Sequence, residues 1–451
     1  MTVIAAKRAL MPEGWKTDIV IRVEDGRIAD VEAQATPDTH VETLLPAPAN
    51  LHSHAFQRAM AGLTERRGPD ASDSFWTWRQ LMFRFLDRLT PADVRAIAAQ
   101  VQMEMLEAGY AAVGEFHYLH HQPGGVPYND PAEMSAQICA AAEDSGIGLT
   151  LLPVLYQTGG LDGRGLGAGQ VRFGSDHDLF GRMLERGATQ IAALSPDANM
   201  GVAPHSLRAV PAGALAEISG AVDGPVHLHL AEQVAEVEEV QAAYGARPVE
   251  WLIDKMPVDG RWCLIHCTHM EPHETKGLAA TGAVAGLCPI TEASLGDGIF
   301  DGVRWLEAGG RIGVGSDSNI RISLSEELRQ LEYSQRLRDR ARAVLADPNR
   351  STARRLFDEV CAGGAQATQR NSGQIATGAW ADLVALHGDH ADLIGREGDV
   401  FLDTWVFARD DALVSDVWAA GRHMVQDGQH IRRDQIEAGY RAVMMRLRDA
   451  L

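Results

Sequence analysis

The chain has 451 residues, 45% of them hydrophobic and 23% charged, which suits one large globular domain with a smaller accessory domain. Its formal net charge of −20 argues against a nucleic acid or an anionic membrane as partner, because both bind through clustered lysine and arginine. No apolar run reaches the ~18 residues of a membrane span. Residues 1–12 lack the layout of a signal peptide, so we expect a cytoplasmic protein.

Short strands are predicted over residues 1–45, where Asp25-Gly26 separates two of them as in a tight hairpin. From there to residue 368, short apolar runs alternate with longer helical segments. The predicted strands are 44–49, 111–116, 148–155, 190–203, 226–230, 262–267, 283–287 and 311–315. Strands separated by helices in this way predict a (β/α)8 barrel. The glycine-rich stretch 159–169 lacks the strand-before, helix-after context of a phosphate loop and is predicted to be a flexible loop.

Strand-like sequence returns over residues 380–386 and 413–425, on either side of a loop-rich stretch. We therefore predict an α/β protein in which a (β/α)8 TIM barrel is inserted between two halves of a small β-sandwich domain. The predicted division assigns residues 1–45 and 372–430 to the sandwich, 46–371 to the barrel and 431–451 to a C-terminal helix.

The cysteines are scattered and form no C-x-x-C pair, which predicts reduced, buried thiols that pack as small hydrophobic side chains. Cys263 and Cys267 stand on either side of His266, so a metal role is the alternative for these two.

Histidines and acids fall at the carboxyl ends of predicted strands, where barrel enzymes build their active sites. His52 and His54 follow the first barrel strand, and residues i and i+2 of an extended segment point the same way. His229 ends a strongly apolar strand, and Glu232 three residues on could hang over the same pocket as a proton carrier. His227 shares the face of His229, so spacing does not choose between them.

Two further strands end in polar residues of the same kind. His266 ends the strand 262–267, and Asp317 follows the strand 311–315. Each residue has an ordinary alternative: H-x-H on a polar surface, Glu232 at the start of a helix, Asp317 as a helix cap. Their joint placement at the ends of four strands favours a first coordination shell for zinc or iron(II), with one position left open for water.

The motifs Asn50-Leu51-His52-Ser53-His54, His229-Leu230-Ala231-Glu232, His266 and Ser316-Asp317 resemble the deaminase branch of the amidohydrolase superfamily, over the whole chain. That branch includes nucleobase deaminases and triazine hydrolases. Binuclear relatives usually carry a lysine at the fourth strand, whereas here this strand ends Ala203-Pro204-His205. The resemblance therefore implies one divalent metal ion, with Zn2+ as the default and Fe2+ as the alternative.

A closer resemblance is to the formimidoylglutamate deiminase family. It is carried by the stretch from Leu51 to Gly62, by Ser74-Phe75-Trp76-Thr77-Trp78-Arg79, Gly114-Glu115-Phe116-His117-Tyr118, Ala203-Pro204-His205-Ser206-Leu207-Arg208 and Gly315-Ser316-Asp317-Ser318. The resemblance implies hydrolysis of N-formimidoyl-L-glutamate to N-formyl-L-glutamate and ammonia in histidine degradation. It implies the metal ligands His52, His54, His229 and Asp317, and substrate contacts from Gln57, Arg79, Tyr118, His205 and Arg208. Asn319-Ile320-Arg321 departs from the family pattern.

The chemistry of that substrate agrees with these residues. Arg79 and Arg208 can each hold a carboxylate through two hydrogen bonds. Glu232, His266 and Asp317 are the predicted catalytic residues: Asp317 takes a proton from water, Glu232 gives one to the departing nitrogen, and His266 stabilises the developing charge. Trp76 and Trp78 are interpreted as packing residues.

Two alternatives stay open. The first is a deaminase or chlorohydrolase acting on a nucleobase or triazine, which would need stacking aromatic residues in place of the arginine pair. The second is an inactive barrel that serves as a scaffold, which would be expected to lose metal ligands. A homodimer is expected because many barrels of this kind dimerise.

Overall fold

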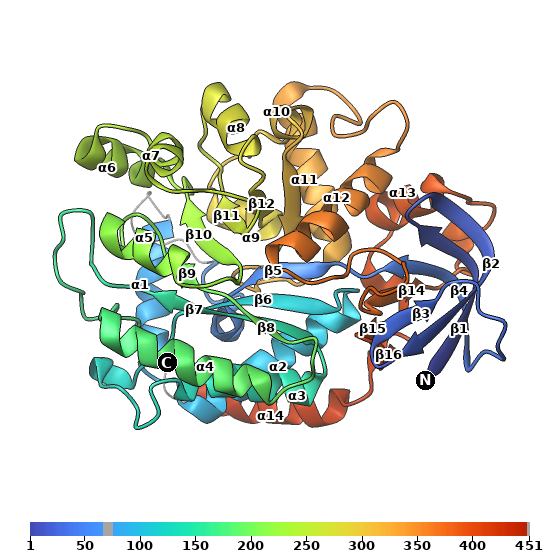
Figure 1. The fold of residues 1–451 in the computed structure, drawn as a ribbon, viewed down its shortest axis with the longest axis horizontal. Coiled ribbons are helices and arrows are strands. Elements are labelled where there is room, and N and C mark those ends of the chain that lie inside the picture. The colour runs from blue at the N-terminus through green and yellow to red at the C-terminus, as the bar shows by residue number, and fades with distance from the viewer. Residues whose placement is uncertain (66–74, 449–451) are drawn as a thin grey trace.

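The protein consists of a barrel with a curved β-sheet beside it, in a computed structural model that describes residues 1–65 and 75–448 (Figure 1). The barrel strands are β5 (Ala49–Ser53), β6 (Ala112–His117), β7 (Gly148–Leu155), β8 (Asn199–Met200), β9 (Ala203–Pro204), β10 (Val226–Leu230), β11 (Trp262–His266), β12 (Val284–Leu287) and β13 (Arg311–Val314). They form two parallel sheets, β5-β6-β7-β8 with β9 beside β7, and β10-β11-β12-β13. Parallel bridges between Val202 and Val226 and between Ser53 and Asp317 join these sheets. The fold is therefore the predicted (β/α)8 barrel.

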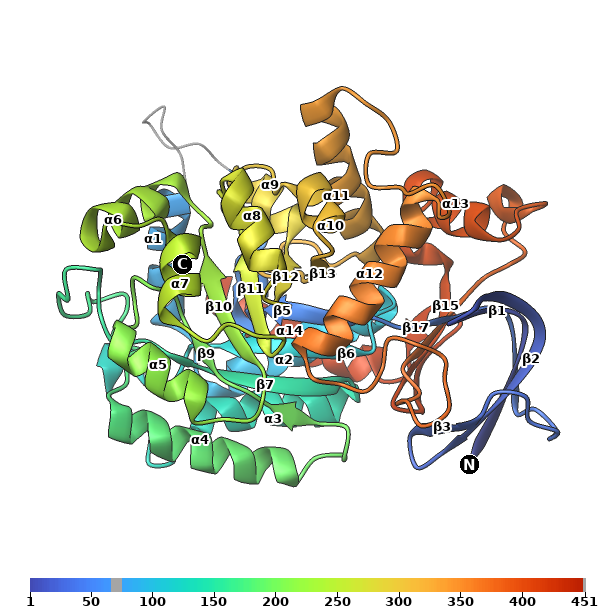
Figure 2. The same ribbon diagram turned by 45° about the horizontal axis from the view of Figure 1, so that its top comes forward.

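Helices cover the outside of the barrel (Figure 2). The helices of the described chain are α1 (Phe75–Leu86), α2 (Pro91–Glu107), α3 (Glu133–Ser145), α4 (His177–Ala192), α5 (Ala212–Gly220), α6 (Val234–Tyr244), α7 (Pro248–Lys255), α8 (Pro272–Ala279), α9 (Pro289–Leu295), α10 (Gly302–Glu307), α11 (Leu324–Asp339), α12 (Thr352–Ala367), α13 (Asp399–Ala408) and α14 (Arg433–Arg448). Of these, α13 packs on α11 and α12. Short 3-10 helices add η1 (Ala55–Met60), η2 (Pro123–Gly125), η3 (Ala391–Leu393) and η4 (Asp411–Leu413). No helix of the described chain is long and apolar enough to cross a membrane.

The predicted limits of two barrel strands are wrong. The run 44–49 spans two strands, because β4 ends at Pro46 and the barrel strand β5 begins at Ala49. Proline has no backbone N–H to continue a strand ladder, so Pro46 and Pro48 favour a change of sheet here. The run 190–203 begins inside α4, which lasts to Ala192, and the fourth barrel position holds the two short strands β8 and β9. Ile191 and Ala192 at the end of this helix are apolar, and a short apolar run does not by itself distinguish a helix end from a strand.

The second sheet joins the two ends of the chain. Its strands are β1 (Thr2–Met11), β2 (Gly14–Glu24), β3 (Arg27–Asp30), β4 (Thr39–Pro46), β14 (Leu383–Leu386), β15 (Val414–Ala419), β16 (Arg422–Gln426) and β17 (Gln429–His430). Their order is β17-β16-β15-β14-β4-β1-β2-β3. The sheet curls so that Ile28 N–H donates to Ala379 O at 2.9 Å, and both arms share a core that includes Ile4, Ile21 and Trp418. This is the predicted small β-sandwich.

Local signals explain other parts of this region. Asp25 and Gly26 have φ values of 49° and 78°, as the predicted tight hairpin requires. The stretch expected to be rich in loops contains α13, whose buried residues Phe401, Leu402, Trp405 and Val406 recur at helical spacing. The C-terminal helix α14 packs against α2, and residues 449–451 of its predicted range lie outside the described residues. The division at residues 45, 371 and 430 stays a prediction.

Candidate active site

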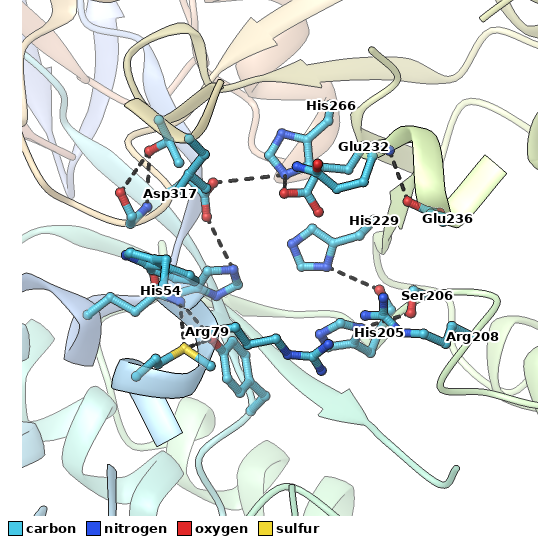
Figure 3. Close-up of a pocket in the computed structure, with 18 of the residues that line it drawn as sticks. His54, Arg79, His205, Ser206, Arg208, His229, Glu232, Glu236, His266 and Asp317 are labelled. Atoms are coloured by element: carbon cyan, nitrogen blue, oxygen red, sulfur yellow. Dashed lines mark hydrogen bonds and ion pairs between the residues drawn. The ribbon is translucent and has the colours of Figure 1, made fainter. Parts of the chain in front are cut away.

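A pocket at the carboxyl ends of the barrel strands gathers almost all the predicted site residues (Figure 3). Those that line it are His54, Gln57, Arg79, Tyr118, His205, Arg208, His229, Glu232, His266 and Asp317. His52 lies behind this surface, fully buried, with its Nε2 atom 3.2 Å from the His229 Nε2 atom. Trp78 packs on the core and also lines the pocket, while the side chain of Trp76 lies outside the described part of the chain.

His52, His54 and His229 form a cluster whose ligand atoms all lie within 4.8 Å of one another. The His54 Nδ1 atom is 2.9 Å from Phe116 O, and the His229 Nδ1 atom is 3.1 Å from His205 O. A carbonyl oxygen only accepts hydrogen bonds, so both Nδ1 atoms carry the ring hydrogen. The Nε2 lone pairs of these two rings are therefore left for the cluster, an arrangement typical of metal-binding histidines.

Burial keeps the three imidazoles neutral. It lowers the pKa of His52 to about 3 and the pKa values of His54 and His229 below their usual range. The Asp317 Oδ1 atom lies 3.3 Å from His54 Nε2 and 3.5 Å from His52 Nε2. Burial opposes ionisation of Asp317, but its interactions with His52, His54 and the cationic His266, first among them the hydrogen bond from His52, lower its pKa. Three neutral imidazoles around one carboxylate suit a divalent cation, which satisfies the Nε2 lone pairs that face each other.

The backbone turns sharply where these side chains leave their strands. Ala231, His266 and Asp317 have φ values of 52°, 73° and 46°. Residues other than glycine rarely adopt this left-handed region, and such strain is concentrated at functional sites. Each of the three positions follows or ends a barrel strand, so the strain lies where the chain must aim a side chain into the pocket.

His266 and Glu232 face the histidine cluster from the other side. The His266 Nε2 atom lies 3.9 Å from both Glu232 Oε1 and Asp317 Oδ2, and its Nδ1 atom lies 3.1 Å from Glu292 Oε1. Burial works against the imidazolium, but the charge of Glu232 and the hydrogen bond to Glu292 raise the pKa of His266 to about 10. His266 is thus a cationic donor aimed into the pocket. Burial raises the pKa of Glu232 above its usual value although the nearby His266 imidazolium opposes that shift, so Glu232 can take up and release a proton, as a proton carrier must.

The opposite wall of the pocket carries positive charge. Arg79 has 9% of its surface exposed, and its Nη2 atom donates to the Tyr156 hydroxyl at 2.9 Å. Burial and the charge of Arg208 are among the causes that lower the pKa of Arg79. Gln57 donates to the Tyr118 hydroxyl at 2.7 Å. Figure 3 shows Arg79 and Arg208 on the side of the pocket that lies away from His266 and Asp317.

The structure decides between the candidates that spacing left open. His227 Nε2 lies 2.8 Å from Ala367 O inside the barrel, and of the pair only His229 lines the pocket. Cys263 and Cys267 are buried free thiols, as predicted. The thiol that approaches the site is that of Cys288, which lies within 4.8 Å of ligand atoms of His266 and Asp317.

Several residues of the pocket were missed from the sequence. They are Ser206, Glu236, Thr291 and Ser318, which line it, and Tyr156 and Glu292, which support lining residues. Tyr156 directly follows β7, so the strand-end rule that found the histidines would also have found it. Glu236 lies one helical turn after Glu232 and carried no signal beyond that spacing.

Comparison with known proteins agrees with this geometry. The model of the Amidohydrolase family matches residues 43–424, so the chain belongs to that family. An adenosine deaminase from Xanthomonas campestris with bound zinc shares the fold at a TM-score of 0.82, with 21% identity over 99% of this chain and 98% of that one.

A finer assignment follows from closer relatives. The model "Formimidoylglutamate deiminase HutF, N-terminal domain" matches residues 1–42. The formimidoylglutamate deiminase of Pseudomonas aeruginosa is 46% identical over 100% of both chains. An amidohydrolase from Brucella melitensis is 47% identical over 99% of this chain and 100% of that one, with a TM-score of 0.94. Within the amidohydrolases, the chain belongs to the formimidoylglutamate deiminase family.

Proposed function

We propose that the protein hydrolyses N-formimidoyl-L-glutamate to N-formyl-L-glutamate and ammonia, a step of histidine degradation. The observation that carries the proposal is the division of charge within one pocket: Arg79 and Arg208 on one wall, Glu232 and Asp317 at the other end. The substrate has the matching division, with two carboxylates at one end and a cationic amidine at the other. The full-length relative from Pseudomonas aeruginosa bears the name of this activity.

For the cofactor we propose one Zn2+ ion held by His52, His54, His229 and Asp317, with Fe2+ as the alternative. The neutral imidazoles and the single carboxylate support this, as does the absence of a lysine from the fourth strand position, Ala203–Pro204. When bound, such an ion lowers the pKa of water toward neutrality. Removal of the ion with a chelator should abolish activity and lower the Tm, because the Nε2 atoms of His52 and His229 then lie 3.2 Å apart without a shared cation.

The wall of the pocket that carries Arg79 and Arg208 binds the substrate. Arg79 and Arg208 each bind one carboxylate through paired hydrogen bonds. Gln57, Tyr118 and His205 add hydrogen bonds, and the burial of Gln57, Arg79 and Tyr118 shields the carboxylates from bulk water. This leaves the formimidoyl group directed toward Glu232 and Asp317.

The reaction needs two proton movements and one new C–O bond. Water attacks the formimidoyl carbon while Asp317 accepts its proton through an oxygen of the carboxylate. The protonated His266 donates a hydrogen bond to the oxygen on which charge develops. Glu232 holds the amidine nitrogen, takes the second water proton from the new hydroxyl group and delivers it to that nitrogen. The C–N bond then breaks, ammonia leaves together with the N-formyl product, and Asp317 releases its proton to solvent.

A nucleobase or triazine substrate fits this pocket less well, because a neutral ring does not need the two guanidinium groups of Arg79 and Arg208. An inactive scaffold is disfavoured by the complete set of predicted ligands and by the convergence of Glu232 and His266 on them. The expected cytoplasmic location and homodimer stay predictions, and sedimentation equilibrium of the purified protein tests the homodimer.

The test is ammonia release by the zinc-loaded protein from N-formimidoyl-L-glutamate, guanine, cytosine and adenosine. Release from the formimidoyl compound alone supports the proposal. At a substrate concentration near the wild-type KM, release should be lost in Arg79→Met and Arg208→Met with metal content unchanged, and much higher substrate concentrations should restore part of it. Release should be retained in Arg84→Met, which removes an exposed arginine of the same helix as Arg79. Turnover of a nucleobase instead would overturn the substrate, and no turnover despite bound metal would favour the scaffold.

A further inference from the structure

The segment between β7 and α4 approaches the active site at Tyr156, a residue that the mechanism above does not use. The Tyr156 hydroxyl accepts hydrogen bonds from Arg79 Nη2 at 2.9 Å and from Gln170 Nε2 at 2.8 Å. The ring is fully buried and lies edge-on against His205, with centroids 4.6 Å apart. Its carbonyl accepts the Ser175 N–H at 3.1 Å. Tyr156 is therefore fixed at its backbone, its ring and its hydroxyl.

Gln170 is held in turn by its own loop. The Gly167 N–H donates to Gln170 Oε1 at 2.9 Å, and the Gln170 N–H donates to Gly167 O at 2.8 Å. Because a backbone N–H can only donate, the side-chain oxygen of Gln170 is the acceptor. The amide nitrogen is then the atom that faces Tyr156. Every hydrogen bond in this chain therefore has one donor and one acceptor: Gly167 N–H donates to Gln170 Oε1, and Gln170 Nε2 donates to the Tyr156 hydroxyl.

The same loop also packs against α1, the helix that carries Arg79. The Phe173 ring lies 6.1 Å from the Phe83 ring and 4.8 Å from the Tyr118 ring, and the Arg79 guanidinium lies 5.2 Å from the Phe83 ring. Arg172 is buried and donates to carbonyls at the end of α1 and beyond it, Leu86 O and Leu89 O. The glycine-rich stretch that was predicted to be flexible thus continues into a segment that supports the arginine helix.

We propose that Tyr156 and Gln170 are positioning residues that set the direction of the Arg79 guanidinium and thereby the preference for a substrate with a second carboxylate. An arginine side chain loses considerable rotamer freedom when it binds a carboxylate. Holding the guanidinium in place beforehand reduces that loss, so the gain appears as tighter substrate binding. The inference rests on the proposed function, in which Arg79 binds a carboxylate.

The first test is Tyr156→Phe, which removes one oxygen atom and keeps the buried ring. The KM for N-formimidoyl-L-glutamate should rise about tenfold with kcat changed less than about twofold, as expected for the loss of a hydrogen bond to a charged group. Gln170→Leu should raise KM in the same direction by a smaller factor. Tyr440→Phe on α14 is the matched control and should leave KM unchanged. A fall in kcat at constant KM in Tyr156→Phe, or no change at all, would overturn the proposal.

A second test asks whether Tyr156 acts through Arg79. In the Arg79→Met background the Tyr156→Phe substitution should add no further rise in KM, whereas independent residues would give additive effects and contradict the proposal. Two substrates that each lack one carboxylate, N-formimidoyl-L-glutamine and N-formimidoyl-γ-aminobutyrate, give a second criterion. The Tyr156→Phe effect should vanish with one of them and persist with the other. Persistence with both would show that Tyr156 does not act on carboxylate recognition.

Calorimetry separates failure of this inference from failure of the proposed function. Glutarate supplies two carboxylates without a formimidoyl group, so its binding does not depend on turnover. Its Kd should rise about tenfold in Tyr156→Phe, and the double variant should bind it as Arg79→Met alone does, even if N-formimidoyl-L-glutamate proves not to be the substrate. An unchanged Kd alongside wild-type turnover would reject the positioning role and leave the proposed function intact.

Discussion

The backbones of His54 and Asp317 are joined directly: the His54 N–H donates to Asp317 O at 2.9 Å, and the two side chains meet at 3.3 Å between Nε2 and Oδ1. The Asp317 N–H donates to His52 O at 3.0 Å in the same ladder. One seam between the first and last barrel strands thus closes the barrel and brings three of the four proposed ligands, His52, His54 and Asp317, together. Because the seam is held by backbone atoms, the ligand side chains can be changed without opening it.

Asp317→Asn should therefore leave the fold intact and remove the chemistry. The amide lacks the negative charge that, together with three neutral imidazoles, suits a divalent cation. It also cannot accept the proton of water. We expect kcat to fall at least about a thousandfold, within the range for loss of a general base, together with reduced metal content. Activity assays, elemental analysis and circular dichroism check this. Near-normal turnover at normal metal content would contradict the role of Asp317, and the exposed Asp254→Asn is the control.

Glu236 should control the orientation of Glu232. Its two carboxylate oxygens accept the N–H groups of Ala231 at 3.1 Å and Glu232 at 3.0 Å, across the left-handed turn at Ala231. Glu236→Gln replaces one acceptor with an NH2 group that faces an N–H, so the turn should loosen and kcat should fall about 10- to 100-fold. The measurement is kcat at saturating substrate, with metal content as a check. Glu239→Gln, exposed on the same helix, should behave as wild type.

Glu115 should make the metal-free protein less stable as the pH rises. Its Oε1 atom accepts the Ala55 N–H at 2.8 Å, and burial raises its pKa to about 7 from an ordinary value of 4.5. Between these values the unfolded chain gives up the proton first while the folded chain keeps it. Stability from this group is therefore complete below pH ~4.5 and is lost as the pH approaches ~7, by up to about 3 kcal/mol.

The comparison of Glu115→Gln with wild type isolates this effect, since the amide does not titrate. The difference in Tm, variant minus wild type, should increase from pH 5 to pH 8 in chelator-treated samples. Glu238→Gln, an exposed substitution, should show a constant difference across the same range. A pH-independent difference for Glu115→Gln would mean that the buried carboxyl does not stay protonated in the folded protein.

Arg370 should contribute strongly to stability and little to catalysis. It is buried, and it donates to Asp382 Oδ2 at 2.6 Å and to Asp197 Oδ2 at 2.8 Å, so it joins the residue before β14 to the loop before β8. Arg370→Met leaves two buried carboxylates without this partner, a change that typically costs about 3–5 kcal/mol. Thermal unfolding should show a much lower Tm at unchanged KM for the folded fraction. Arg186→Met, which breaks the exposed pair with Asp130, should barely change the Tm.

The sequence by itself determined the class of fold and the chemical character of the site. Alternation of apolar runs and helical segments predicted the barrel, because strands and helices each leave their own spacing of apolar residues in the sequence. The ends of parallel strands share one face of a barrel, so His52, His54, His229 and Asp317 could be placed together before any contact was known. Family resemblance then supplied Arg79 and Arg208, which no local pattern singles out.

Only the tertiary structure decided what depends on contacts between distant segments. His227 and His229 share a strand face, and only their surroundings distinguish them. His227 is hydrogen-bonded to Ala367 O, whereas His229 lines the pocket. The barrel strand β5 starts at Ala49 because Ala49 pairs with β6. The fourth strand is split because β8 and β9 pair with different parts of β7. The support of Arg79 by Tyr156 and Gln170 joins α1 to the loop after β7. Such contacts produce no periodic pattern in the sequence, because they exist only after the segments have packed together.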